Sequence, residues 1–225
     1  MRLKLTFELE KKFIDIEYRK AFISYFKYCL CDVDKKYFKQ FYDNTNKKNF
    51  SFAVYLDKPQ RNNDVFELSS NIVSLNISFL DEKQGYLYYA AFLRQINKLF
   101  NIKNNQMKLI SVNKINETKI VNDCVIIKTL SPICLLDHNH ELHDNKKDYY
   151  YSIIDNDFTK IFEEKTGLKI QPIDCKKVMV RHYNISIPTT IGTFIISGDS
   201  NKINKLYKSG IGNKTGQGFG MIDII

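Results

Sequence analysis

The sequence predicts an α+β protein made of two tandem ferredoxin-like domains, each a split βαβ unit with an antiparallel sheet, as in RRM-like modules. Apolar residues alternate with a period of two at the start of the chain, change to helical spacing, and return to period two. The same order of elements recurs in the second half. At 225 residues and 44% hydrophobic, the chain is long enough for a core in each half. We expect domains at residues 1–116 and 117–225.

The first half shows the order strand, helix, strand, strand, helix, strand. The opening strand places Leu3, Leu5 and Phe7 on one face, which is typical of a half-buried strand. The segment "KPQRNND" between the next two strands favours a turn. The expected elements are a strand at 2–9, helices from 18 and at 35–42, strands at 50–56 and 65–80, a helix at 89–100 and a strand at 106–115.

The second half repeats this order more loosely. A hairpin of two long apolar segments is expected to turn at Pro188, because proline interrupts strands. The expected elements are a strand within 119–130, a helix near 156–166, hairpin strands at 176–187 and 190–197, a helix at 201–208 and a closing strand at 218–225.

The formal net charge of +9 favours a partner with a phosphate backbone. Only five of the cations are arginines, and an abundance of Lys, Asn and Ile also arises from a low-GC genome, so charge alone leaves both interpretations open. The first residues alternate apolar and charged, and nowhere do eighteen apolar residues run together, so we expect a cytoplasmic protein without a membrane partner. The five cysteines form no CxxC pair and are expected to be reduced.

The segment "GIGNKTGQGFG", residues 210–220, contains five of the nine glycines. It lacks the Gly-Lys-Ser/Thr of a Walker loop and the third glycine of the dinucleotide fingerprint, and a strand rather than a helix follows it. We expect Gly210 to cap the preceding helix, and the other glycines to let the backbone lie against something large. A purely structural loop is the alternative.

With the following Met221 and Ile222, this loop resembles the C-terminal glycine-rich loop of CRISPR-associated endoribonucleases that cut precursor CRISPR RNA (pre-crRNA) within its repeats, a family of the RAMP superfamily. "KTLSPI" at 128–133 and "YSIIDNDFTKIFEEKTG" at 151–167 are similar to that family as well. The resemblance implies two ferredoxin-like domains with CRISPR repeat RNA in the basic cleft between them.

The resemblance also implies which residues contact RNA. Backbone amides of a loop without side chains can approach phosphates closely, and cations beside them supply counter-charge. Val at Gly212 or Gly218 is then expected to weaken RNA binding without unfolding the protein. The expected RNA-binding residues are Gly210, Gly212, Lys214, Gly216, Gly218, Phe219, Arg181, Lys176 and Lys177. The lysines and Arg181 are open to a second interpretation, as ordinary surface charges.

Chemistry in this family is similar to that of metal-independent ribonucleases, so no cofactor or metal is expected. The ribose 2′-hydroxyl attacks the adjacent phosphate, leaving a 2′,3′-cyclic phosphate and a 5′-hydroxyl. Many members use a histidine after the first helix, whereas this chain has no histidine between residues 1 and 137. The expected catalytic residues are Lys48 or Lys47 for the phosphorane charge and leaving oxygen, Lys27 as a further cation, and Tyr42 or Tyr28 to orient the 2′-hydroxyl.

The histidines of the chain lie elsewhere. The segment "DHNHELHD" holds His138, His140 and His143, but their spacing matches no standard metal site, so we expect a polar loop there. His182, beside Arg181 on a predicted strand, is expected to be a packing or surface residue, with a role as general base as the alternative.

Three function classes remain from the sequence. The first is an RNA-processing endoribonuclease, and the second is a non-catalytic member of the same family that binds repeat RNA without cutting it. The third is a small-molecule-binding regulatory domain, which the lysine-rich composition and the glycine-rich loop disfavour. Other CRISPR effector proteins are possible partners, and the protein is expected to be a monomer or homodimer.

Overall fold

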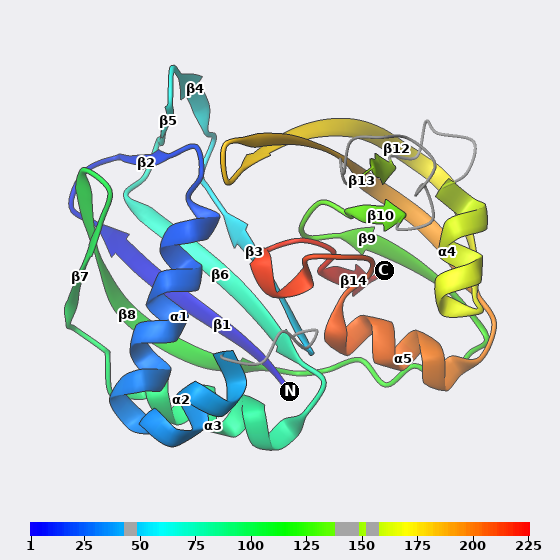
Figure 1. The fold of residues 1–225 in the computed structure, drawn as a ribbon, viewed down its shortest axis with the longest axis horizontal. Helices are drawn as coiled ribbons and strands as arrows, with labels where there is room; N and C mark the ends of the chain where they lie inside the picture. Colours follow the sequence, from blue (N-terminus) through cyan, green and yellow to red (C-terminus); the bar gives the residue numbers. More distant parts are fainter. Residues whose placement is uncertain (43–48, 138–148, 152–157) are drawn as a thin grey trace.

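The computed structural model describes residues 1–42, 49–137, 149–151 and 158–225. The first half forms a five-stranded antiparallel sheet with the order β3-β6-β1-β8-β7. Its helices pack on one face (Figure 1). The elements are β1 (Arg2–Leu9), α1 (Arg19–Val33), α2 (Lys35–Tyr42), β3 (Phe50–Tyr55), β6 (Ile72–Phe79), α3 (Glu82–Leu93), β7 (Leu99–Ile102) and β8 (Asn105–Ile115).

The second half forms a four-stranded sheet with the order β12-β13-β9-β14. Numbered within each half, both sheets place their principal strands in the order second, third, first, fourth, so the predicted duplication of the ferredoxin-like fold is confirmed. The elements are β9 (Cys124–Thr129), α4 (Phe158–Thr166), β12 (Lys169–His182), β13 (Ile185–Ser197), α5 (Ser200–Ser209), the 3₁₀ turn η1 (Thr215–Gln217) and β14 (Ile222–Ile224), with β10 (Leu135–Asp137) and β11 (Tyr149–Tyr151) paired separately.

Apolar side chains at every second position explain how the first sheet buries one face. Leu3, Leu5 and Phe7 of β1 are completely buried in the first core, where Phe7 meets the rings of Phe22 and Tyr25 of α1 edge-on. Burial of such large rings stabilises the fold through the apolar area that they remove from water. No helix in the described part of the chain combines the length and apolar character that crossing a membrane needs.

Two of the first-half predictions were wrong in detail. The expected strand at 65–80 is split into β5 (Val65–Glu67) and β6, and β5 pairs with β4 (Gln60–Asn62) and β2 (Phe13–Asp15) in a small separate sheet. The helix expected at 89–100 begins at Glu82, because the Asp81 side chain accepts a hydrogen bond from Lys83 N and caps it. Leu99 belongs to β7, where pairing with β8 overrides the helical spacing of its apolar residues.

The hairpin of the second half does not turn at Pro188. β12 and β13 turn at Tyr183 and Asn184, which both have positive φ, as a two-residue hairpin turn requires. Pro188 lies inside β13, paired with Met179, in a stretch where β13 is not paired with β9. A proline without a backbone N–H is tolerated there because that side of the strand is an edge.

Arg2 joins the two halves. Its buried guanidinium donates to Ser78 Oγ, Asp223 Oδ1 and the carbonyl oxygens of Tyr207 and Ile222, so all three of its nitrogens are used. The N-terminal amine also pairs with Glu117 at 2.6 Å. The division into units 1–116 and 117–225 stays a prediction, and it falls in the segment between β8 and β9.

Candidate nucleic-acid interface

The glycine-rich loop, residues 210–220, packs against the first half of the chain. It lies along β3, which is an edge strand of the first sheet. A Cβ atom on Gly210 would lie 2.7 Å from Ser51 Cβ, and one on Gly218 would lie 2.9 Å from the Phe52 ring. The large surface that the loop approaches is therefore protein, at least for these two glycines.

Two further glycines are fixed by backbone contacts inside the second half. Gly212 has φ +81°, and an added Cβ would lie 2.3 Å from the carbonyl oxygen of Cys134. Gly220 has φ +68°, and its Cβ would meet the backbone of Ile211. The expectation that Val at Gly212 or Gly218 leaves the fold intact is therefore wrong, because each position combines a left-handed backbone with a steric clash. Gly216 is the loop glycine without a positive φ.

Phe219 faces the core and not solvent. Its ring is completely buried with Cys134, Val180 and Ile187, and lies 5.4 Å from the ring of His182. The expected RNA contact through the Phe219 side chain is thus corrected: in this structure the ring packs the loop onto β12 and β13.

His182 is buried beneath the loop, with 1% of its surface exposed. One ring nitrogen, Nε2, lies 2.9 Å from Gln217 Oε1, while Nδ1 has no hydrogen-bond partner among the residues that the structure describes. Burial lowers the pKa of His182, and the nearby charges of Arg19 and Lys214 lower it further, against the Gln217 hydrogen bond and Glu17, which raise it. A neutral, packed imidazole agrees with the packing role expected from the sequence.

The structure brings together two of the predicted catalytic residues. Tyr42, at the end of α2, has its hydroxyl 2.8 Å from that of Tyr88, and Lys27 Nζ lies 5.2 Å from the centre of the Tyr42 ring. Burial raises the pKa of Tyr42 to about 12, so its phenol stays protonated at neutral pH and can donate a hydrogen bond. Tyr28 is not in this group: its half-exposed ring packs 5.3 Å from Phe100 of β7.

Lys47 and Lys48 lie outside the described residues, in the segment 43–48 between α2 and β3. His138, His140 and His143 lie outside them too. Within the described ranges, no three His, Cys, Asp or Glu side chains gather as a metal site.

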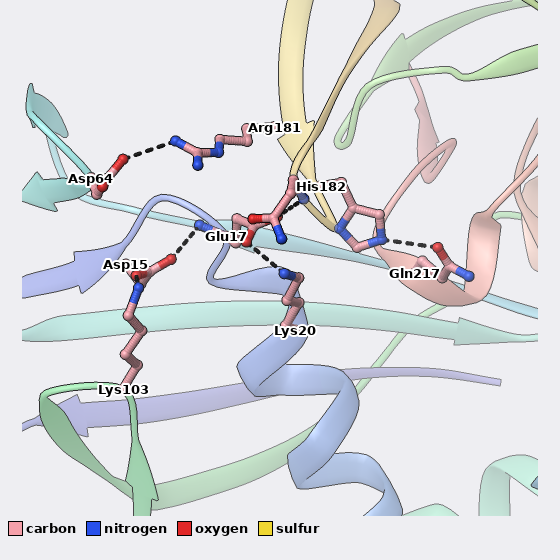
Figure 2. A network of polar contacts seen from close by, with 9 residues as sticks. Asp15, Glu17, Lys20, Asp64, Lys103, Arg181, His182 and Gln217 are labelled. Atoms are coloured by element: carbon pink, nitrogen blue, oxygen red, sulfur yellow. Dashed lines mark hydrogen bonds and ion pairs between the residues drawn. The ribbon is translucent and has the colours of Figure 1, made fainter. Parts of the chain in front are cut away.

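The turn of β12–β13 contacts the start of the first half (Figure 2). Arg181 pairs with Asp64 of the β4–β5 turn at 2.9 Å, and the amide of Asn184 donates to Glu17 at 2.9 Å. Lys20 pairs with Glu17 as well. The predicted RNA-binding residue Arg181 is thus held by a carboxylate, although both partners remain exposed.

Lys176 and Lys177 are exposed on β12. Side chains of consecutive strand residues point to opposite faces of a sheet, so Lys176 and Lys177 cannot both contact RNA from the same face. Lys176 shares the lining of a cavity with Lys128 of β9. Lys214 is half-buried, has φ +57°, and lies close enough to His182 to lower the pKa of that imidazole.

A groove of about 390 Å³ separates the β12–β13 hairpin from the start of α1. We call it the basic groove; its lining includes three of the five arginines, two aromatic rings and apolar strand residues, namely Arg19, Arg61, Arg181, Tyr18, Phe66 and Met179. Tyr18 and Phe66 are partly buried and pack edge-on against each other. Cations beside aromatic rings suit a nucleic-acid strand, because phosphates pair with the cations and bases can stack on the rings.

Comparison with known proteins identifies the family. The sequence model of the CRISPR-associated protein Cas6, C-terminal, matches residues 114–224, which include β9, the β12–β13 hairpin and the glycine-rich loop. This match places the second half of the chain in the Cas6 family. No curated protein matches the sequence.

Solved Cas6 and RAMP structures share the whole fold. A Cas6-related protein from Pyrococcus furiosus superposes with a TM-score of 0.85 at 19% identity, covering 100% of this chain and 98% of the other. A RAMP protein that binds different RNA substrates gives 0.83 at 19% identity, with 100% and 99% covered. A Cas6 product complex gives 0.70 at 12% identity, with both chains fully covered. At these identities the likeness concerns the fold alone.

Sequence reasoning did not single out Arg19, Arg61 or Gln217 as site residues. Arg19 lies about 200 residues from the loop that it contacts, and its Nε donates to the carbonyl oxygen of Gly218 at 3.1 Å. No periodicity or spacing in the sequence points to such a contact. The scarcity of arginine in a lysine-rich chain was the one available signal.

The Arg181–Asp64 pair gives a prediction with a small effect. Asp64→Asn should change the free energy of unfolding by less than about 1 kcal/mol, because exposed ion pairs contribute little. The same change should strengthen RNA binding several-fold at low salt, since it frees Arg181 and removes a negative charge. Denaturant titration and filter binding measure the two quantities. Weaker RNA binding by this variant would show that Asp64 holds Arg181 in its binding position.

Proposed function

We propose that this Cas6-family protein binds CRISPR repeat RNA and cuts it at one phosphodiester without a metal. The 2′-hydroxyl at the cut gives up its proton to solvent and attacks the neighbouring phosphate. The bond from phosphorus to the 5′-oxygen breaks and that oxygen takes a proton, so the products end in a 2′,3′-cyclic phosphate and a 5′-hydroxyl. The family match over 114–224 is the observation that carries this proposal. The basic groove and the net charge of +9 support it.

In this proposal, the catalytic group is formed by Lys27 and Tyr42 together with Lys47 and Lys48. The chain enters segment 43–48 directly after Tyr42, so the two lysines follow the Lys27–Tyr42 contact in sequence. A protonated lysine stabilises the charge of the phosphorane and donates to the leaving oxygen, and each such role contributes about 10²- to 10⁴-fold in rate. Tyr42 donates a hydrogen bond that orients the ribose.

A non-catalytic RNA-binding protein is the second candidate, because no histidine occurs among the first 137 residues. Incubating the purified protein with its host's repeat RNA in EDTA separates the two. Cleavage at one position supports the enzyme, and a mobility shift with intact RNA supports the binding protein. Absence of both would remove repeat RNA as the ligand. Further CRISPR effector partners and a monomeric or dimeric state remain predictions.

Repeat-RNA affinity should fall steeply with salt. Cations that neutralise phosphates release counterions, so log K should decline against log salt with a slope of about −0.7 for each phosphate contacted on a single strand. Titrations between low and physiological salt measure the slope. A slope near zero would mean that the positive charge of the protein does not hold RNA.

A further inference from the structure

The basic groove contains a buried arginine without a carboxylate. Arg19 is 8% exposed, and its guanidinium lies 4.8 Å from the centre of the Tyr18 ring and 5.2 Å from that of Phe219. Its Nε donates to the carbonyl oxygen of Gly218. Among the described residues, neither Nη atom of Arg19 has a hydrogen-bond acceptor, and no carboxylate lies within ion-pair distance.

Arg2 is the internal comparison. It is also buried, at 4% exposed, yet its three nitrogens meet four acceptors, one of them the carboxylate of Asp223. A buried cation is costly unless it is paired and hydrogen-bonded, and a guanidinium offers five N–H groups. Arg2 meets that requirement within the protein, whereas Arg19 leaves both amino groups open.

These open donors face a space that a ligand can enter. Arg19 lines the basic groove together with Arg61 and Arg181, and the Nη atoms are not among the enclosed polar atoms that lack partners. The nearby acid Glu17 is already engaged by Lys20 and by the amide of Asn184. His182, whose pKa is lowered by burial, is neutral or positive in its two protonation states and so supplies no negative charge to Arg19.

We propose that Arg19 is the centre of a phosphate-binding subsite for RNA in the basic groove, separate from the Lys27–Tyr42 group. The two Nη atoms of Arg19 bind the non-bridging oxygens of one phosphodiester. Tyr18 and Phe66 line the groove beside the RNA strand. Arg19 and Lys27 are eight residues apart on α1, about 12 Å along the helix axis. The bound phosphate is therefore not the one that is cut. This proposal rests on the proposed RNA-binding function.

A phosphate scan tests the subsite. The probe is a 2′-O-methyl copy of the host repeat RNA, which cannot be cut, with one methylphosphonate introduced at each position in turn. Wild-type protein should lose about tenfold in affinity when the methylphosphonate replaces the phosphate that Arg19 binds, as expected for a lost charge-assisted pair. Arg19→Gln should bind the unmodified probe about tenfold more weakly and show no further loss at that phosphate, while other sensitive positions stay sensitive.

Two variants control the result. Arg94→Gln removes one exposed arginine outside the groove and should keep the wild-type phosphate profile. Arg19→Lys keeps the charge without the planar fork, and should reduce the penalty at that phosphate from about tenfold to about threefold. It carries the test if Arg19→Gln does not fold, which thermal melting reveals.

An unchanged wild-type phosphate profile in the Arg19 variants would overturn the subsite and leave the proposed function standing. A wild-type protein that does not bind the probe at all would overturn both.

Discussion

Lys48→Ala should lower the single-turnover rate of repeat-RNA cleavage by about 10²- to 10⁴-fold, while the affinity for RNA falls far less. A cation that holds the charge of the phosphorane acts in the transition state, so its loss appears in the chemical step. Rates measured with enzyme in excess and affinities measured on 2′-O-methyl RNA separate the two effects.

Tyr42→Phe is the companion variant. It removes the hydroxyl that lies 2.8 Å from that of Tyr88 and should also reduce the rate more than the affinity. Tyr28→Phe is the matched control, because the Tyr28 ring packs on Phe100, whereas Lys27 contacts the ring of Tyr42. Equal rates for Lys48→Ala, Tyr42→Phe and wild type would place the chemistry elsewhere.

Gly220→Val should destabilise the protein by about 2–6 kcal/mol, which is comparable with the whole stability of many domains. Gly220 has φ +68°, and any Cβ at this position would collide with the backbone of Ile211. Strain and overpacking each cost about 1–3 kcal/mol. Denaturant unfolding followed by circular dichroism measures the loss.

Gly216→Ala provides the control for that experiment. The backbone of Gly216 lies outside the left-handed region, so the free energy of unfolding of this variant should be within about 1 kcal/mol of the wild-type value. Equal stability of Gly220→Val and Gly216→Ala would mean that the loop is not packed as the structure describes.

The repeated order of strands and helices could be predicted because period-two and helical patterns are local. The strand β1 is predicted by the alternation of Leu3, Leu5 and Phe7 alone, without knowledge of the rest of the chain. The turn of β12–β13 could not be placed, since Pro188 is a stronger local signal than Tyr183 and Asn184. The proline is tolerated only because β13 has a free edge at that point, which is a property of the sheet.

The site was predictable only in part. Lys27 and Tyr42 were expected together, and the structure brings them together. The glycine-rich loop was recognised, but its glycines were assigned to RNA contact when Gly210 and Gly218 accommodate Ser51 and Phe52 of β3. Arg19 was missed because its burial depends on the loop of the other half folding over it. Contacts between distant segments leave no periodic trace in a sequence.

The pH dependence of single-turnover cleavage tests the central claim, that lysine and tyrosine of the first half cut the RNA without a histidine. Burial raises the pKa of Tyr42 to about 12, so Tyr42 keeps its proton across the neutral range. The rate should climb toward alkaline pH, because the ribose 2′-hydroxyl then loses its proton more readily, and it should show no inflection near 6.5, the usual pKa of a histidine. His182→Ala should leave that profile unchanged. A bell-shaped profile centred near neutrality, abolished by His182→Ala while Lys48→Ala stays active, would contradict the account.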